Sequence, residues 1–492
     1  TSVSQFSDVR PTDWAYQALS NLVERYGCVA GYPNGTFKGG QAMTRYEAAA
    51  LLNACLDRIS EVTDELKKLM AEFEKELAVL RGRVDGLEAK VGELEANQFS
   101  TTTKLKGIAT FVLGANSFGG GNDNVADAAR TLEGATAFAY DVRLNFDTSF
   151  TGKDLLRTTL RAGNFGDSPW GGAATVGTNG ANLGLNALEV AFQENCGTAD
   201  CGDVVAINRL FYQFPVGNGF TATVGARVRQ DDMLAMWPSV YPADTVLDIF
   251  TYAGAPGTYS LNLGAGGGLW WKNGNWSISA NYVSANGDVG NPSAGGIATS
   301  GSQETGTVQL GYGSSNFGLA VAYTYTNGAG LYTGNGTPLA VYGFSNSDSV
   351  NSVGVSGYWQ PSTAGWFPSI SAGWGLNSHN ADDNGFVGKV VDGATTQSWY
   401  VGLQWADAFV KGNTLGMGVG QATFMTNSGD DKLLEANDGN YAWEWWYKFQ
   451  VTDNISVTPA IYYLSVPEGQ FQKSNNDSFS NFGGMLKTTF KF

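Results

Sequence analysis

Charged side chains recur at alternate positions in the middle of the chain, on what would be one face of an extended strand. In the stretch TAFAYDVRLNFD, residues 136–147, Asp141, Arg143 and Asp147 share a face, because successive strand side chains point to opposite sides. Later runs of the same kind add further arginines: Arg157, Arg161, Arg209, Arg227 and Arg229. A guanidinium group binds carboxylates and other anions through a planar fork of N–H donors. If this face meets water, these residues indicate electrostatic sorting of solutes.

An unusually apolar acidic segment follows directly. DDMLAMWPSVYPADTVLDIFTYAGAP, after Gln230, contains four aspartates: Asp231, Asp232, Asp244 and Asp248. Such a segment is unfavourable as a free surface loop, so we expect it to fold inward. Opposite the arginines it would form a constriction with a transverse electric field. The alternative is that the arginines are solvated, or paired with Asp141 and Asp147.

The sequence offers little for catalysis or for a bound cofactor. The single histidine, His379, falls in an expected loop, which excludes a Ser–His–Asp triad or a multi-histidine metal site. Four loop aspartates could hold a divalent cation, but solvated carboxylates are favoured: Asp382, Asp383, Asp430 and Asp431. We expect neither an enzyme nor a cofactor. The net charge of −16 disfavours a nucleic-acid partner.

Four cysteines form two pairs in the sequence, Cys28 with Cys55 and Cys196 with Cys201. In an exported protein these could be two disulfides; free buried thiols are the alternative. No signal segment precedes Thr1, so the chain is expected to be a mature product whose export signal has been removed.

The elements that would position these residues are short strands. From about residue 100 the hydrophobic period is two, and sixteen strands are expected, joined alternately by seven short and eight long connections. A closed antiparallel barrel with lipid outside and water inside has this pattern; a soluble sandwich is the alternative. Aromatic residues at strand ends fit an interfacial girdle: Trp405, Trp443, Trp445, Tyr462 and Tyr463. The last strand, ending in Phe492, should close against KLKGIATFVLGA.

The first part of the chain differs in character. Residues 1–58 are expected to form a small helical module, with Thr44 and Glu47 at capping-box spacing. Residues 59–98 carry apolar side chains in steps of three and four, which predicts a self-associating coiled-coil stalk of roughly 60 Å. A single amphipathic helix packed on the remaining domain, residues 99–492, is the alternative.

The N-terminal residues FSDVRPTDWAYQAL, GYPNGTFKGG and MTRYEAAALLN resemble a surface-layer-homology (SLH) domain. The whole chain is similar to cyanobacterial outer-membrane porins that carry such a domain, with a barrel like that of carbohydrate-selective porins. The resemblance implies binding to peptidoglycan or a wall-linked polysaccharide through five candidates: Trp14, Gly35, Thr36, Phe37 and Arg45. Tyr46 departs from the small residue more usual at its position.

The expected fold is therefore mainly β, a 16-stranded transmembrane barrel after an SLH domain and a stalk. The expected function is passive diffusion of inorganic ions and small solutes across the outer membrane, with the stalk and SLH domain in the periplasm tethering that membrane to the wall. A carbohydrate-selective pore and a mainly structural tether are the alternatives. The resemblance also implies a homotrimer in contact with outer-membrane lipid.

Overall fold

The structure is a computed structural model that describes residues 2–14, 16–56, 71–74, 79, 83–86, 102–120, 124–171, 175–176, 181–182, 184–194, 202–244, 246–328, 336–381, 391–429, 438–470 and 478–492. The chain divides into two compact units, residues 1–98 and 99–492.

The first unit contains a small helical module with its own core. Its elements are η1 (Val3–Gln5), α1 (Tyr16–Ser20), η2 (Asn21–Arg25) and α2 (Arg45–Leu56). The buried residues of this core are Val3, Phe6, Leu19, Val23, Cys28, Val29 and Cys55. A disulfide joins Cys28 to Cys55, which confirms one of the two possible cysteine pairs. It ties α2 to the segment that follows η2.

The start of α2 has the predicted capping box. The Thr44 amide donates to the Glu47 carboxylate at 2.9 Å, and the Glu47 amide donates to Thr44 Oγ1 at 3.2 Å. These two bonds satisfy amides that have no partner within the helix. The expected stalk, residues 59–98, lies outside the described residues except for 71–74, 79 and 83–86, which are helical. The coiled coil and the domain boundary near residue 58 stay predictions.

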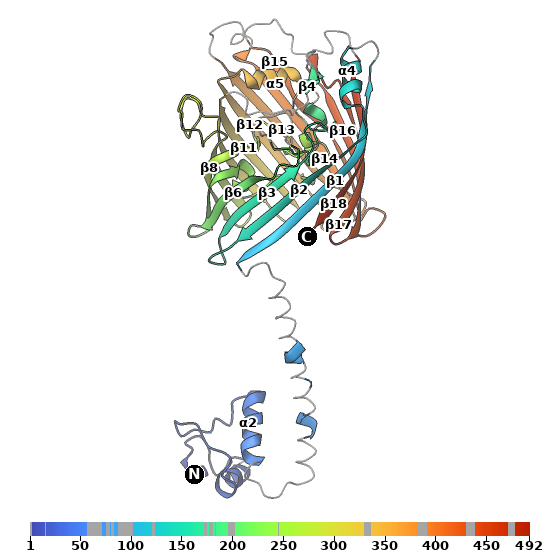
Figure 1. The fold of residues 1–492 in the computed structure, drawn as a ribbon. Coiled ribbons are helices and arrows are strands. Elements are labelled where there is room, and N and C mark those ends of the chain that lie inside the picture. The colour runs from blue at the N-terminus through green and yellow to red at the C-terminus, as the bar shows by residue number, and fades with distance from the viewer. Residues whose placement is uncertain are drawn as a thin grey trace. The chain divides into compact units, whose positions relative to one another are not determined.

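The second unit is a closed antiparallel barrel of sixteen strands, as predicted (Figure 1). In sequence order the barrel strands are β1 (Thr103–Gly119), β2 (Ala137–Thr148), β3 (Leu155–Gly163), β6 (Ala206–Pro215), β7 (Phe220–Arg229), β8 (Leu263–Asn273), β9 (Trp276–Ser284), β10 (Glu304–Gly313), β11 (Phe317–Asn327), β12 (Ser349–Trp359), β13 (Ser369–Asn380), β14 (Thr395–Ala406), β15 (Thr414–Asn427), β16 (Tyr441–Thr452), β17 (Ile455–Ser465) and β18 (Ser480–Lys491). Short and long connections alternate throughout. The last strand closes on the first, with Phe111 opposite Thr488 and Val112 opposite Lys487.

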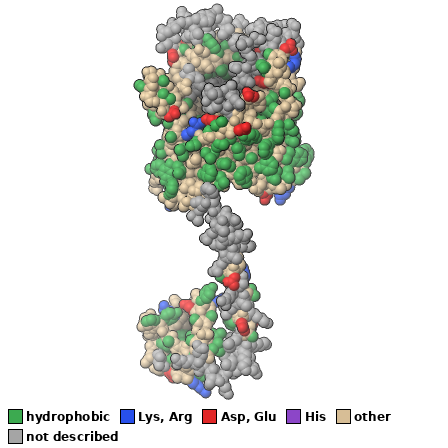
Figure 2. Space-filling model, in the orientation of Figure 1, with side chains coloured by type: hydrophobic (Ala, Val, Ile, Leu, Met, Phe, Trp, Pro, Cys, Tyr) green, Lys and Arg blue, Asp and Glu red, His purple; other side chains and the backbone are tan. Residues whose placement is uncertain are grey.

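The two faces of the barrel differ in chemistry. Along β11, Leu319, Val321 and Tyr323 are exposed on the outside, whereas the intervening Ala320 and Ala322 are buried. Figure 2 shows hydrophobic side chains gathered in a band over the strands on the face in view. An apolar exterior of this kind is what a lipid-facing barrel requires. None of the described helices is long and apolar enough to cross a membrane.

The long connections carry the remaining elements. These are α4 (Asn124–Glu133), β4 (Thr175–Val176), β5 (Ala181–Asn182), η3 (Gly184–Asn186), η4 (Gln230–Met233), η5 (Asp248–Phe250) and α5 (Pro338–Ser345). Two of the connections fold into the barrel. We call residues 230–244 and 246–262 the inner loop, and residues 184–194 the second inner segment.

Two side chains lie elsewhere than expected. His379 is not in a loop: it lies near the end of β13, fully buried, with Ser347 Oγ at 2.9 Å from Nδ1 and Thr396 Oγ1 at 3.0 Å from Nε2. Tyr462 does not belong to an outer aromatic girdle. It is buried inside the barrel and donates to Asn116 Oδ1 at 2.6 Å, because it and Tyr463 are neighbours on one strand and must face opposite sides.

Candidate functional site

The inner wall of the barrel is shaped to receive the inner loop. A Cβ atom on Gly373 would lie 1.8 Å from the Ala253 carbonyl oxygen, and one on Gly402 would lie 2.5 Å from the Tyr241 ring. Larger residues at these wall positions would therefore push the loop away from the wall. Glycine lets the Ala253 backbone pack directly against β13 and the Tyr241 side chain pack directly against β14.

Serine hydroxyls on the same strands fix the loop by hydrogen bonds. Ser371 Oγ accepts from the Val240 and Tyr241 amides at 3.0 and 3.1 Å. Ser356 donates to the Ala253 carbonyl at 2.6 Å, and Ser398 donates to the Gly254 carbonyl at 2.9 Å. The expectation that this segment folds inward is confirmed. Its attachment points span β12, β13 and β14.

A buried carboxylate holds the middle of the loop. Glu444 on β16 is fully buried and accepts from the Tyr241 hydroxyl and the Leu247 amide, both at 2.7 Å. Trp446 Nε1 donates to the same Tyr241 hydroxyl at 2.9 Å. A buried carboxylate must receive hydrogen bonds to be tolerated, so Glu444 and the loop position each other.

The second inner segment packs against the inner loop. The Glu189 amide donates to the Val246 carbonyl at 3.2 Å, and the Asp248 amide donates to the Ala187 carbonyl at 2.9 Å. Apolar residues of both segments and of the wall form one core, which includes Trp170, Leu188, Tyr241, Leu247 and Phe250. The sequence predicted an inward fold only for the segment after Gln230, and it missed that residues 184–194 also narrow the lumen.

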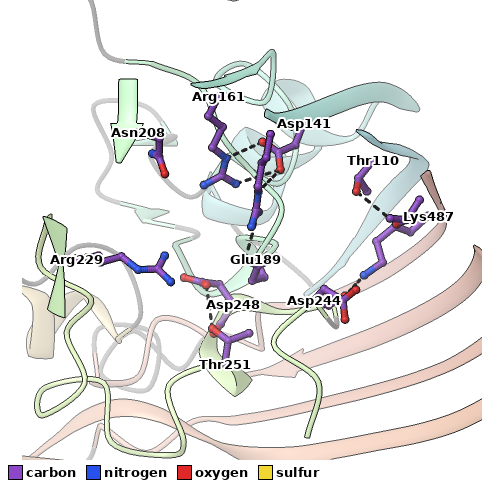
Figure 3. Close-up of polar contacts among 12 residues, drawn as sticks. Thr110, Asp141, Arg161, Glu189, Asn208, Arg229, Asp244, Asp248, Thr251 and Lys487 are labelled. Carbon is purple, nitrogen blue, oxygen red and sulfur yellow. Dashed lines mark hydrogen bonds and ion pairs between the residues drawn. The ribbon is translucent and has the colours of Figure 1, made fainter. Parts of the chain in front are cut away.

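A cavity of about 560 Å³ is left between these two segments and the wall. We call it the passage. Arg161, Asn208, Arg209 and Arg229 line the wall side. The loop side carries Glu189, Phe192, Asp231, Trp237, Asp248 and Tyr252. The passage thus combines cations, carboxylates and aromatic rings, and Figure 3 shows several of them converging from the wall and from the inner loop.

Carboxylates lie beside the arginines of β2 and β3. Asp141, almost fully buried, accepts from Arg143 Nε and Arg161 Nε, both at 2.7 Å (Figure 3). Asp147 accepts from Arg157 Nε at 2.8 Å and from Lys106 Nζ at 2.9 Å. These contacts are the paired arrangement that the sequence left open as an alternative.

Two of the predicted loop aspartates lie next to arginines rather than across the lumen from them. Asp231 accepts from Arg229 Nε at 2.5 Å, and Asp232 accepts from Arg209 Nε at 2.7 Å. Asp248 accepts from the Tyr252 hydroxyl at 2.7 Å. Within the passage, therefore, positive and negative charges largely cancel at short range.

Arg227 is placed differently from the other arginines. The register of β7 shifts between Gly225 and Val228, and Val228, expected on the outer face, is buried in a core with Phe211 and Met233. Within the described part of the chain, no ion pair involves Arg227, and Arg227 does not line the passage. Its Nε is buried without a hydrogen-bond partner. A bulge of this kind cannot be located from alternation alone.

Asp244 lies apart from the other three loop aspartates. The Lys487 ammonium on β18 donates to the Asp244 main-chain carbonyl (Figure 3). Lys487 is buried and was not among the predicted pore residues. Alternation along GGMLKTTFKF, which puts Lys487 and Lys491 opposite Leu486, was the signal that could have found it.

The predicted wall-binding residues lie in the first unit. Trp14 is 98% exposed, so it is not part of the core. Asp8 accepts from the Phe37 amide at 2.7 Å and the Lys38 amide at 2.5 Å, and the bond from Phe37 is the main reason that the pKa of the Asp8 carboxyl is lowered. Asp8 therefore fixes the turn that presents the predicted ligand residues.

The remaining candidates of the turn and helix have local structural roles as well. Gly35 has a φ of +75°, a conformation that favours glycine. Thr36 donates to Asn34 Oδ1 at 2.7 Å, and the Phe37 ring lies 5.9 Å from that of Phe6. Arg45 is the first residue of α2. The exposed side chain of Trp14 is available to contact a polymer.

Some predictions fall outside the described residues. These are the possible disulfide between Cys196 and Cys201 and the acidic loop positions Asp382, Asp383, Asp430 and Asp431. In the part of the chain that is described, no group of three or more His, Cys, Asp or Glu residues is arranged to hold a metal ion.

Comparisons with known proteins agree with this architecture. A family model described as "Carbohydrate-selective porin, OprB family" matches residues 61–492, and one for the S-layer homology domain matches residues 5–49. The uncharacterized protein alr4550 of Nostoc sp. is 36% identical over 100% of this chain and 85% of its own length. The uncharacterized protein sll0772 of Synechocystis sp. is 31% identical over 100% of this chain and 91% of its own.

A solved structure shares the barrel fold. It is the high-pH structure of Pseudomonas putida OprB, with a TM-score of 0.51 and 13% identity, covering 82% of this chain and 96% of that one.

Proposed function

This chain belongs to the carbohydrate-selective porin family OprB. We propose that it is a diffusion channel and that it passes inorganic ions and small solutes down their gradients. Porins are channels rather than enzymes, and this one resides in the outer membrane with its SLH domain in the periplasm. The proposal concerns the solute and the residues that select it.

The passage is the single observation that favours small charged solutes. The inner loop and the second inner segment fill much of the lumen, and the cavity left beside them is about 560 Å³. Charged groups from Arg161, Arg209, Arg229 and Asp231 line it. The charges of this lining balance in number, but fixed charges of both signs still favour small ions over bulky neutral molecules.

The SLH domain anchors the barrel to cell-wall polymers. We propose Trp14 and Arg45 as its main ligand residues, with the turn at Gly35, Thr36 and Phe37 holding the same surface. A guanidinium can fork onto an acidic group of a glycan, and an exposed indole can stack on a sugar ring. Tethering and diffusion are compatible in one chain.

We further propose a homotrimer, by resemblance to other porins and from the apolar period of residues 59–98. Three SLH copies would then bind the wall with greater avidity and no new contacts. Chemical cross-linking of the detergent-solubilised chain should give a trimer, and a monomer alone would contradict this part.

Planar-bilayer recording of the purified full chain tests the main proposal. We expect discrete channel steps in potassium chloride, whereas a chain that is only a tether gives none. The Arg229→Gln variant should change the reversal potential in a salt gradient, because Arg229 lines the passage. An unchanged reversal potential would remove this residue from selectivity.

A carbohydrate-selective pore is the second candidate, and the aromatic side chains of Phe192, Trp237 and Tyr252 in the passage favour it. Aromatic faces stack on sugar rings. Liposome swelling separates the two candidates: swelling in isotonic sugars as fast as in salts of similar size would favour the sugar pore.

A further inference from the structure

A second group of cations lies in the barrel, away from the passage. Lys448 on β16 and Lys487 and Lys491 on β18 line two cavities of about 50 and 220 Å³. The two cavities share Lys448, Ser456 and Thr489 in their linings, so they adjoin. We call them together the lysine chamber.

The chamber lies at the tight-turn end of the barrel. Lys491 is the last residue of β18, and its amide donates to the Asn454 carbonyl at 2.8 Å. Asp453 and Asn454 form the turn between β16 and β17, and both line the larger cavity. Tight turns of such barrels face the periplasm, so the chamber lies at the periplasmic end of the barrel.

Lys487 is an ammonium group in an unusually buried position. Its residue is only 6% exposed, and it donates to the Asp244 carbonyl of the inner loop. Hydroxyl residues surround it on the wall, since Ser456, Thr458 and Thr489 line the same cavity. Burying a charge is costly unless hydrogen bonds or counter-charges compensate, and both the carbonyl and the carboxylate of Asp244 do so for Lys487. The case for a further anion therefore depends on the balance of charges in the whole lining.

Charges in the chamber do not cancel as they do in the passage. Its lining holds three lysines, Lys448, Lys487 and Lys491, against two carboxylates, Asp244 and Asp453. Asp244 is the main counter-charge of Lys487, and Glu189 and Glu444 are weaker ones. Both carboxylates have other partners, however: Glu189 pairs with Arg143 at 3.3 Å, and Glu444 accepts from Tyr241 and Leu247.

We propose that the lysine chamber binds a small inorganic oxyanion of the phosphate class. Ammonium groups and the hydroxyls of Ser456 and Thr489 are donors that the several oxygens of one oxyanion can accept from together. A halide ion accepts from several donors too, but it and nitrate carry a single charge, whereas the oxygens of phosphate share between one and two negative charges at neutral pH. The inference rests on the proposed channel function and names an ion that the channel would hold.

The test measures block of chloride current by inorganic phosphate in bilayers containing the full chain. At constant ionic strength and pH 7.5, phosphate should reduce the wild-type current in a saturable way, and nitrate should not. Lys448→Gln and Lys491→Gln should each raise the half-blocking phosphate concentration by roughly tenfold, because each removes a charge-assisted donor. These two are preferred to a change at Lys487, whose burial makes misfolding a risk.

Lys411→Gln is the matched control. Lys411 lies in the turn between β14 and β15, at the same end of the barrel but in neither cavity lining, and we expect wild-type block. Absence of phosphate block in the wild type, or equal block in all variants, would overturn the oxyanion site. Channel steps would persist in both cases, whereas their absence would instead refute the proposed channel.

Discussion

Glu444 is the buried carboxylate that holds the middle of the inner loop. Its two carboxylate oxygens receive the Tyr241 hydroxyl and the Leu247 amide, and both donors are buried. Removing a buried acceptor leaves its donors without partners, which costs about 1–3 kcal/mol for each group. The wall would then hold the loop mainly through the serines of β12–β14.

We expect Glu444→Ala to enlarge the lumen by loosening the inner loop. Single-channel recordings should show a higher mean conductance and larger current fluctuations than those of the wild type. Glu304→Ala is the control, since Glu304 accepts from the Tyr282 hydroxyl but lines neither the passage nor the lysine chamber. Identical recordings from Glu444→Ala and the wild type would contradict a loop held by this carboxylate.

Asp141 sets the charge balance of the neighbouring wall. It accepts from both Arg143 and Arg161 at 2.7 Å, so Asp141→Asn leaves two guanidinium groups with one carboxylate fewer. The reversal potential in a salt gradient should shift toward anion preference. Asp288→Asn, in the exposed connection between β9 and β10, makes the same charge change elsewhere and should leave the reversal potential unchanged. A cation shift in Asp141→Asn would refute this role.

At the scale of elements, period-two alternation was enough to predict the strands, because a barrel wall separates two solvents along every strand. Alternation could not predict where strands are irregular. The bulge in β7 buries Val228. The inner loop packs directly on Gly373 and Gly402 of the wall. Alternation predicted that Asp141 and Arg143 share a face, but it could not show that their side chains form an ion pair. Glu444 was not predicted, because a single carboxylate in the strand YAWEWWYKFQ gives no indication of the loop groups that it binds.

The carboxyl group of Glu133 should hold α4 against the second inner segment while it is uncharged. Glu133, the last residue of α4, is buried, and Asn186 Nδ2 donates to it at 3.2 Å. Burial raises the pKa of Glu133 from 4.5 to about 7. The docked state therefore holds its proton more tightly than an undocked state does. The contribution of Glu133 to the free energy of opening α4 is fully present below pH 4.5 and is lost as the pH rises through about 7.

Hydrogen exchange of residues 124–133 measures this effect. Protection of α4 should fall between pH 5 and pH 8 after correction for the intrinsic exchange rate, by up to roughly 3 kcal/mol in the free energy of opening. Glu133→Gln should keep α4 protected at both pH values, because the amide carries no charge. Protection of wild-type α4 that does not change with pH would contradict a buried neutral Glu133.

At the scale of the whole molecule, two units with separate cores carry separate tasks. The core around Val23 and Cys55 contains no barrel residue, and the barrel closes on itself through β1 and β18. Changes on the surface of the first unit should therefore leave the channel intact. The two activities can be tested independently in one full-length protein.

Wall binding should depend on exposed residues of the first unit. Trp14→Ala and Arg45→Ala should each lower co-sedimentation of the full chain with purified peptidoglycan sacculi by roughly tenfold, as is usual for an aromatic or arginine residue that dominates a contact. Trp14 is 98% exposed, so its loss should not unfold the module. Arg25→Ala is the control, because Arg25 is exposed on η2 and stacks on Tyr26. Single-channel conductance should stay at the wild-type value in all three variants. Undiminished sedimentation of both Trp14→Ala and Arg45→Ala would contradict a wall-binding surface built on these two residues.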